Sequence, residues 1–112
     1  MTDISDKIQK LESKFSGEIF TDISTRIMYS TDASAYREIP GAVVYPKTRQ
    51  DIKLLISFAS QNKTSIIPRT AGTSLAGQVV GGGIIADVSR YMTKILEINT
   101  KERWVLVQPG VV

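Results

Sequence analysis

Two residue types are missing from this chain of 112 residues, and each absence removes a class of chemistry. Without cysteine there is no disulfide framework, no thiolate nucleophile and no cysteine-ligated zinc or iron–sulfur cluster. Without histidine there is no Ser-His-Asp triad, no histidine general base and no histidine metal ligand. Carboxylates are present, but none forms a close pair at the spacing of metal ligands. We therefore assign neither a catalytic residue nor a metal site to this sequence.

Long apolar runs are also missing, since none approaches the roughly 20 residues that a membrane-spanning helix needs. The first 14 positions carry six charged residues where a secretory signal would have its apolar centre. No transmembrane segment is therefore expected, and the cytoplasm is the expected location. The net charge is only +3, and no basic stripe with interleaved aromatic residues occurs, so no nucleic-acid partner is expected.

Hydrophobic periodicity divides the chain into an N-terminal helical and irregular segment, residues 1–39, and a more regular part, residues 40–112. In the first segment, apolar residues spaced four, three and four apart predict a helix over 4–15, with Asp3 or Thr2 as its cap. The rest of that segment has no clear period. Its turn-rich stretch at 29–36 predicts a capped helical turn near residues 30–32.

The regular part predicts a β-α-β unit followed by three further strands. Its helix, residues 49–62, has Thr48 as cap and Asp51 at the third helical position. Because crossovers of this kind are right-handed, the two strands of the unit are expected to be parallel. The expected strands are 42–45, 65–67 with Pro68 ending it, 84–88, and a hairpin of 95–98 and 104–107.

The most unusual stretch is RTAGTSLAGQVVGGG at 69–83, which holds five of the eight glycines. It leaves the end of a predicted strand, where ligands of α/β folds tend to bind. Gly72 and Gly77 allow positive φ, and the loop adds hydroxyls and one arginine but no acid. A diphosphate needs this combination of short donors. A plain flexible surface loop is an equal alternative from composition alone, because the P-loop and Rossmann patterns are both absent.

The order of residues in the loop is more specific evidence for a function than its composition. RTAGTSLAGQ at 69–78 closely resembles the pyrophosphate loop of the FAD-linked oxidases of the vanillyl-alcohol oxidase type, in which Arg-x-x-Gly-Thr-Ser-x-x-Gly-Gln recurs. Four other segments resemble the D-lactate dehydrogenase and glycolate oxidase flavoprotein-subunit branch of this family. In chain order they are YSTDAS at 29–34, VVYPKTRQDIKLLISFASQNK at 43–63, IIADVSRYMTKILEIN at 84–99 and VLVQPGVV at 105–112.

The resemblance implies an α+β fold, the first subdomain of a PCMH-type FAD-binding domain, with a small mixed sheet, a β-α-β unit and flanking helices. It implies that the loop wraps the FAD pyrophosphate, with a proline near the adenine and residues 109–111 along the dinucleotide groove. Some members attach FAD through a histidine just after the loop glycine, where this chain has Thr73, so the implied FAD is non-covalent. The implied FAD-binding residues are Pro46, Pro68, Arg69, Thr70, Ala71, Gly72, Thr73, Ser74, Gly77, Gln78, Pro109, Gly110 and Val111.

The resemblance also implies that the complete protein oxidises a small 2-hydroxy acid such as D-lactate or glycolate. Family members continue past Pro-Gly-Val with a second FAD-binding subdomain and a cap domain. The chain is therefore expected to be an N-terminal fragment that is inactive alone and self-associates through apolar surface around Val111 and Val112. Two alternatives are a reductase of an enolpyruvyl sugar nucleotide in cell-wall synthesis, and a non-catalytic nucleotide- or anion-binding module. The sequences GTSLAGQ and YSTDAS argue against the reductase.

Overall fold

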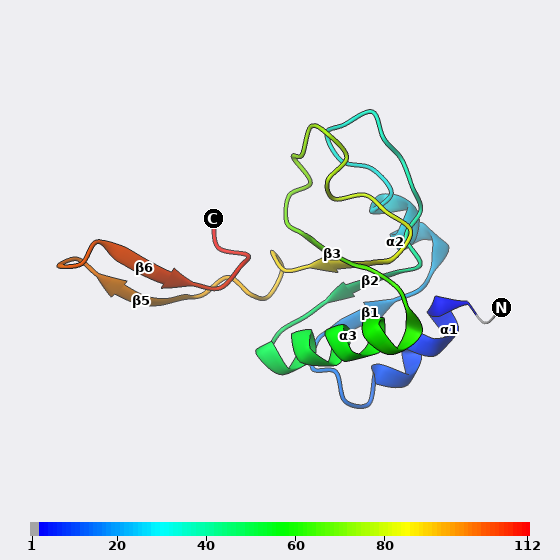
Figure 1. Ribbon diagram of the computed structural model, residues 1–112, viewed down its shortest axis with the longest axis horizontal. Helices are drawn as coiled ribbons and strands as arrows, with labels where there is room; N and C mark the ends of the chain where they lie inside the picture. The colour runs from blue at the N-terminus through cyan, green and yellow to red at the C-terminus, as the bar shows by residue number, and fades with distance from the viewer. Residues whose placement is uncertain (1–2) are drawn as a thin grey trace.

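The computed structural model describes residues 3–112, which form a four-stranded mixed sheet, flanking helices and a two-stranded hairpin (Figure 1). The helices are α1 (Ile4–Ile8), the 3₁₀ turn η1 (Gln9–Leu11), α2 (Ile23–Met28) and α3 (Arg49–Asn62). The strands are β1 (Glu18–Phe20), β2 (Ala42–Tyr45), β3 (Ile66–Arg69), β4 (Ile84–Asp87), β5 (Ile95–Asn99) and β6 (Trp104–Val107). The mixed sheet with flanking helices confirms the predicted α+β architecture.

The N-terminal segment is part of the same folded body as the rest of the chain. The Asp3 side chain accepts a hydrogen bond from the Ser5 amide and caps α1, while Thr2 lies outside the described residues. The α-helix ends at Ile8, earlier than predicted, although Ile8 and Phe15 both reach the core as the apolar spacing indicates. The predicted helical turn at 30–32 is wrong, because the second helix begins at the Asp22 cap and ends before that stretch.

The β-α-β unit forms as predicted because its signals are local. Thr48 caps α3 by accepting a hydrogen bond from the Asp51 amide. The Asp51 carboxylate, which is fully buried, accepts hydrogen bonds from the amides of Ser16 at 2.8 Å, Gly17 at 3.0 Å and Lys47 at 2.9 Å. The Asp51 side chain therefore joins the start of α3 to the two residues that directly precede β1.

The strand order, β1-β2-β4-β3, places the three parallel strands side by side. The predicted parallel strands β2 and β3 are indeed parallel, but β4 lies between them. Pro68 was predicted to end β3. This prediction is wrong, because Pro68 lies within the strand, opposite Ala86. Proline lacks an N–H donor and is tolerated there because β3 is one of the two edge strands of this sheet. The carboxyl ends of β3 and β4 meet where Arg69 lies opposite Asp87.

Two apolar clusters cover the two faces of the sheet, as the alternation of side chains along β2 requires. Ala42 and Val44 point into the cluster that α3 and the N-terminal segment cover. Val43 and Tyr45 point into the opposite cluster, which includes Tyr29. No helix among residues 3–112 has both the length and the apolar character needed to cross a membrane.

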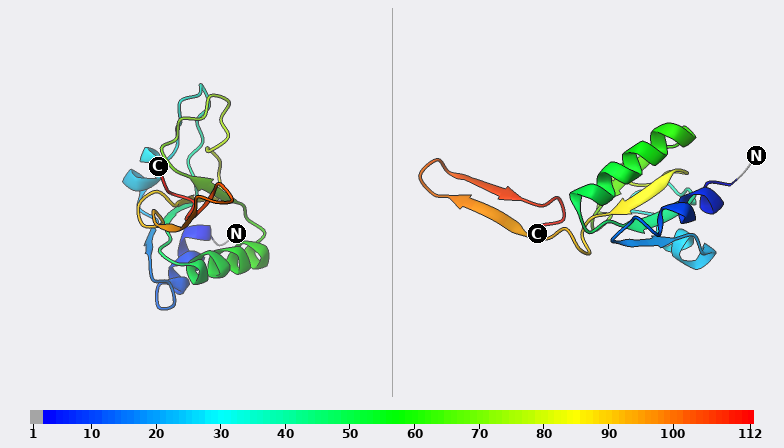
Figure 2. Two further views of the ribbon diagram at one scale, coloured as in Figure 1. Left: turned by 90° about the vertical axis from the view of Figure 1, so that its left-hand side faces the viewer. Right: turned by 90° about the horizontal axis from the view of Figure 1, so that it is seen from below.

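The hairpin of β5 and β6 extends away from the sheet, as Figure 1 and the right-hand view of Figure 2 show. Nearly all of its strand residues are exposed, although many are apolar. They include Ile95, Leu96, Ile98, Trp104, Val105, Leu106 and Val107. The pairing of the two predicted strands is confirmed, but they bring no residue into either core cluster.

Candidate functional site

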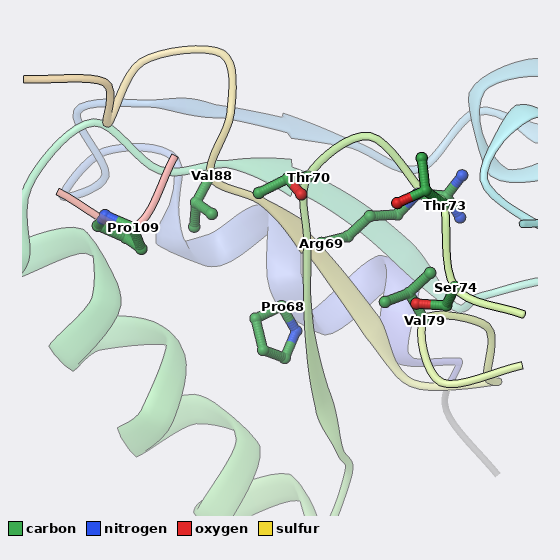
Figure 3. A pocket seen from close by; sticks show the side chains of 9 residues that line it. Pro68, Arg69, Thr70, Thr73, Ser74, Val79, Val88 and Pro109 are labelled. Atoms are coloured by element: carbon green, nitrogen blue, oxygen red, sulfur yellow. The ribbon is translucent and has the colours of Figure 1, made fainter. Parts of the chain in front are cut away.

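A pocket of about 210 Å³ lies at the carboxyl edge of the parallel strands, under the glycine-rich loop (Figure 3). Because β3 and β4 are parallel neighbours, the residues that follow them lie together at this edge. The pocket is lined by Pro68, Arg69, Thr70, Gly72, Thr73, Ser74, Val79, Val88 and Pro109. The structure thereby brings together seven of the thirteen residues that the resemblance implies for FAD binding.

Pro109 reaches this pocket from the far end of the chain because the segment after β6 returns to the end of β4. The Gly110 amide donates to the Met92 carbonyl at 2.8 Å. A Cβ at Gly110 would lie 2.1 Å from the Val88 carbonyl oxygen, so a glycine is required for this close approach. Gly110 itself is buried behind the pocket wall and does not line it.

The other predicted residues lie outside the pocket. Pro46 is fully buried at the end of β2, which leaves no surface of its side chain for an adenine. Gly77 lines a second, separate pocket with Tyr36 and Val80. The remaining three residues line neither of these two pockets: Ala71, Gln78 and Val111.

Two apolar lining residues, Val79 and Val88, were not predicted from the sequence. Val88 directly follows β4, so its place at the pocket follows from β4 being the parallel neighbour of β3. Val79 carries no such signal, because it reaches the pocket only through the path of the irregular loop. Both residues add apolar surface to a pocket that was predicted from the hydroxyl side chains, glycines and arginine of the loop.

The loop offers donors and no acid, since none of the nine lining residues carries a carboxylate. Thr70 and Thr73 are exposed, and Ser74 is partly exposed, so their hydroxyls are accessible. Gly72 has a φ of +69°, the left-handed region in which a side chain is strained. Short hydroxyl donors and a backbone without side-chain bulk fit a diphosphate group, whose oxygens only accept hydrogen bonds at neutral pH.

The Arg69 guanidinium does not point into open solvent beside this loop. Its Nη1 donates to the Thr31 carbonyl at 2.7 Å and lies 3.5 Å from the Tyr29 carbonyl. The guanidinium carbon lies 5.1 Å from the centroid of the Tyr29 ring, within cation–π distance. Arg69, which the resemblance implies as a pyrophosphate ligand, thus makes its contacts with residues 29–31 in this structure.

A hydrogen-bonded network lies next to this arginine at the end of β4. The Tyr29 hydroxyl donates to Asp87 Oδ2 at 2.6 Å and lies 2.9 Å from the Tyr45 hydroxyl. The other Asp87 oxygen accepts from the amide and hydroxyl of Ser89, at 2.9 and 2.6 Å. Burial, followed by the hydrogen bond to Asp87, raises the pKa of Tyr29 above its ordinary value. Tyr29 therefore stays protonated and remains a donor to the buried carboxylate.

The sequence profile of the FAD binding domain family matches residues 40–112, and the chain belongs to this family. Among curated proteins, the D-2-hydroxyglutarate dehydrogenase of Haemophilus influenzae is 45% identical over 101 residues, which is 88% of this chain and 10% of that protein. The glycolate oxidase subunit GlcD of Bacillus subtilis is 34% identical over 90 residues, 78% of this chain and 19% of that protein. The chain therefore spans between a tenth and a fifth of the length of these relatives.

Among solved structures, alkyldihydroxyacetonephosphate synthase superposes with a TM-score of 0.82 at 19% identity, over 98% of this chain and 23% of that chain. A likeness at this identity shows a shared fold. Together with the family match, it confirms the predicted fold. The match to the FAD binding domain family confirms FAD as the cofactor that the loop sequence implies. The likeness to the glycolate oxidase branch is confirmed by the relative from Bacillus subtilis.

Proposed function

We propose that the pocket under the glycine-rich loop binds the pyrophosphate of FAD non-covalently, in a protein that oxidises a small 2-hydroxy acid. The observation that carries this proposal is the pocket itself. In a chain of the FAD-binding family, the loop after β3 surrounds a hollow with three hydroxyls and no carboxylate. The absence of histidine and cysteine from the chain is the reason for proposing non-covalent attachment.

Seven of the nine lining residues divide into two roles in this proposal. Thr70, Thr73 and Ser74 donate hydrogen bonds to the pyrophosphate oxygens, together with amides of the loop. Apolar wall comes from the side chains Pro68, Val79, Val88 and Pro109. When bound, FAD supplies the oxidising chemistry, since its flavin ring accepts a hydride from the carbon that carries the substrate hydroxyl. We assign no catalytic residue to this chain.

The substrate class is proposed from the names of the relatives. They are a dehydrogenase of D-2-hydroxyglutarate and a subunit of glycolate oxidase, and both names refer to 2-hydroxy acids. This agreement favours oxidation of a 2-hydroxy acid over the cell-wall reductase and over a non-catalytic module. The cytoplasmic location and the boundary between residues 39 and 40 stay predictions.

The proposed function is tested by the visible spectrum of the complete protein that contains this chain. We expect a flavin spectrum, and we expect it to bleach without oxygen when D-2-hydroxyglutarate, D-lactate or glycolate is added. Pyruvate serves as the control, because its C2 is a ketone carbon and carries no hydrogen to transfer as a hydride. It should leave the spectrum unchanged. A complete protein that is colourless and cannot be reconstituted with FAD would contradict the proposal.

We also propose that residues 1–112, expressed alone, self-associate, and that the contacting surface is the hairpin rather than the region around Val111 and Val112 that the sequence indicates. The apolar residues on β5 and β6 are exposed on a projecting element, and neither outer edge of the hairpin is paired in the described sheet. Unpaired edges with apolar side chains favour pairing with another copy. Sedimentation should show association that Ile98→Lys weakens and that Lys101→Gln, at the hairpin turn, leaves unchanged. A monomer at all concentrations would contradict this expectation.

A further inference from the structure

The segment YSTDAS at 29–34 lines no part of the pocket, yet it lies directly against the loop that does. In Figure 1 the connection between α2 and β2 and the loop between β3 and β4 run together on the same side of the sheet. The Ala33 amide donates to the Gly72 carbonyl at 3.0 Å, which joins the two segments through their backbones. The left-hand view of Figure 2 shows the same two segments together.

Arg69 makes the second connection between these segments. Its Nη1 donates to the Thr31 carbonyl, and its guanidinium carbon lies over the Tyr29 ring, 5.1 Å from the ring centroid. The same guanidinium fills the space beside Gly72, because a Cβ there would lie 2.4 Å from Nη2. Arg69 therefore packs between the loop and residues 29–31, with contacts on both sides.

The segment that receives Arg69 is itself firmly held. The Tyr29 hydroxyl is bound to Asp87 at the end of β4, next to the strand that carries Arg69. Ser30 is 1% exposed, and its hydroxyl donates to the Ile27 carbonyl at 2.6 Å, at the end of α2. The Glu38 amide donates to the Ser30 carbonyl at 3.0 Å. Tyr29 and Ser30 are thus tied to β4, α2 and Glu38, next to a loop that has only turns and bends of its own.

We propose that residues 29–33 are a clamp that holds the glycine-rich loop in its binding shape, and that Arg69 is a positioning residue bound to this clamp rather than a ligand of the pyrophosphate. The role assigned to the loop rests on the proposed FAD function. A guanidinium suits the task because its planar fork donates to a carbonyl while its face stacks on a ring. A lysine ammonium keeps the charge but has neither the fork nor the flat face.

The difference between a positioning arginine and a phosphate ligand is measurable with three variants of the complete protein. We expect Arg69→Gln and Arg69→Lys to weaken FAD affinity by a similar factor, on the order of tenfold, because both lose the clamp contacts. Lys101→Gln removes one positive charge at the hairpin turn and is expected to leave FAD affinity unchanged. An Arg69→Lys variant that binds FAD nearly as well as the unchanged protein would overturn the proposal, because charge alone would then suffice.

Hydrogen exchange without FAD separates this proposal from the proposed function. In both Arg69 variants, the Ala33 amide, which donates to the Gly72 carbonyl, should exchange faster than in the unchanged protein. Amides of β2 and β4 should keep their protection and report an intact fold. In Lys101→Gln the Ala33 amide should exchange at the original rate. Unaltered exchange of the Ala33 amide in both Arg69 variants would overturn the clamp even if FAD binds. Faster exchange in a protein that never binds FAD would support the clamp and contradict the FAD site.

Discussion

The guanidinium of Arg69 occupies the place where a side chain of Gly72 would begin. A Cβ built on Gly72 lies 2.4 Å from Arg69 Nη2, and the glycine has a φ of +69°. The three-residue spacing lets the last residue of β3 fold back beneath its own loop. In Arg-x-x-Gly, therefore, the arginine and the glycine depend on one another, and the glycine makes room for the arginine as well as for a ligand.

Gly72→Ala should weaken FAD affinity by about tenfold or more, which corresponds to about 1.4 kcal/mol. The added methyl group strains the positive φ and displaces the Arg69 guanidinium from the clamp. The matched control is Gly82→Ala, because Gly82 is exposed and the closest atom to its Cβ is the flexible end of Glu38. Flavin fluorescence titration of the complete protein measures both affinities. Equal losses in the two variants would contradict the special role of Gly72.

Asp51→Ala should lower the free energy of unfolding by about 3 kcal/mol, because three amides lose a charged acceptor in a buried place. Glu12→Ala, which removes an exposed carboxylate from the N-terminal segment, should change the free energy of unfolding by less than about 0.5 kcal/mol. Denaturant unfolding of the two variants gives the comparison. If Asp51→Ala were as stable as Glu12→Ala, the link between α3 and the approach to β1 would be unimportant.

Tyr29 should make folding stability depend on pH in the alkaline range. Burial and the hydrogen bond to Asp87 raise its pKa above the ordinary 10.0, so the folded protein holds this proton more tightly than the unfolded chain. Its contribution to stability is therefore complete below pH 10 and is lost as the pH rises further. Tyrosinate absorbance should show a delayed fraction that disappears in Tyr29→Phe and persists in Tyr36→Phe, an exposed control. The absence of a delayed fraction in the unchanged protein would contradict the buried hydrogen bond.

Residues 1–112 alone should bind FAD no more tightly than micromolar and show no dehydrogenase activity. The pocket that they form lies at the surface, where a diphosphate stays partly solvated and its attraction is screened by salt. Much of the affinity for a dinucleotide normally comes from enclosing its ring systems, which a pocket of this size does not do. Titration of FAD into the purified chain measures the dissociation constant. A nanomolar value would show that this part of the protein suffices.

Local signals explain what was predictable from the sequence. The Thr48 cap, the Asp51 position and the apolar face of α3 lie within a few residues of one another, so the sequence alone locates the helix. β1 and α2 went unpredicted because they are three and six residues long, too short for a period to show. Pro68 was expected to end its strand, since only the tertiary strand order reveals that β3 is an edge.

The candidate site was predictable as a loop but not as a set of contacts. The sequence of residues 69–74 located the pocket, because these residues lie at and just after the end of β3. The burial of Pro46 and the turning of Arg69 toward Thr31 depend on segments far away in the chain. No local pattern contains that information, so the contacts between residues 29–33 and the loop needed the folded structure.

The role of the loop and the role of Arg69 are both tested by a crystal structure of the complete protein with FAD bound. We expect pyrophosphate oxygens within hydrogen-bonding distance of Thr70, Thr73 or Ser74, through hydroxyls or loop amides. We also expect the Arg69 guanidinium to donate to the Thr31 carbonyl in that structure, as it does without FAD. A pyrophosphate bound away from this loop, or held directly by Arg69, would rule out the proposed site and the clamp.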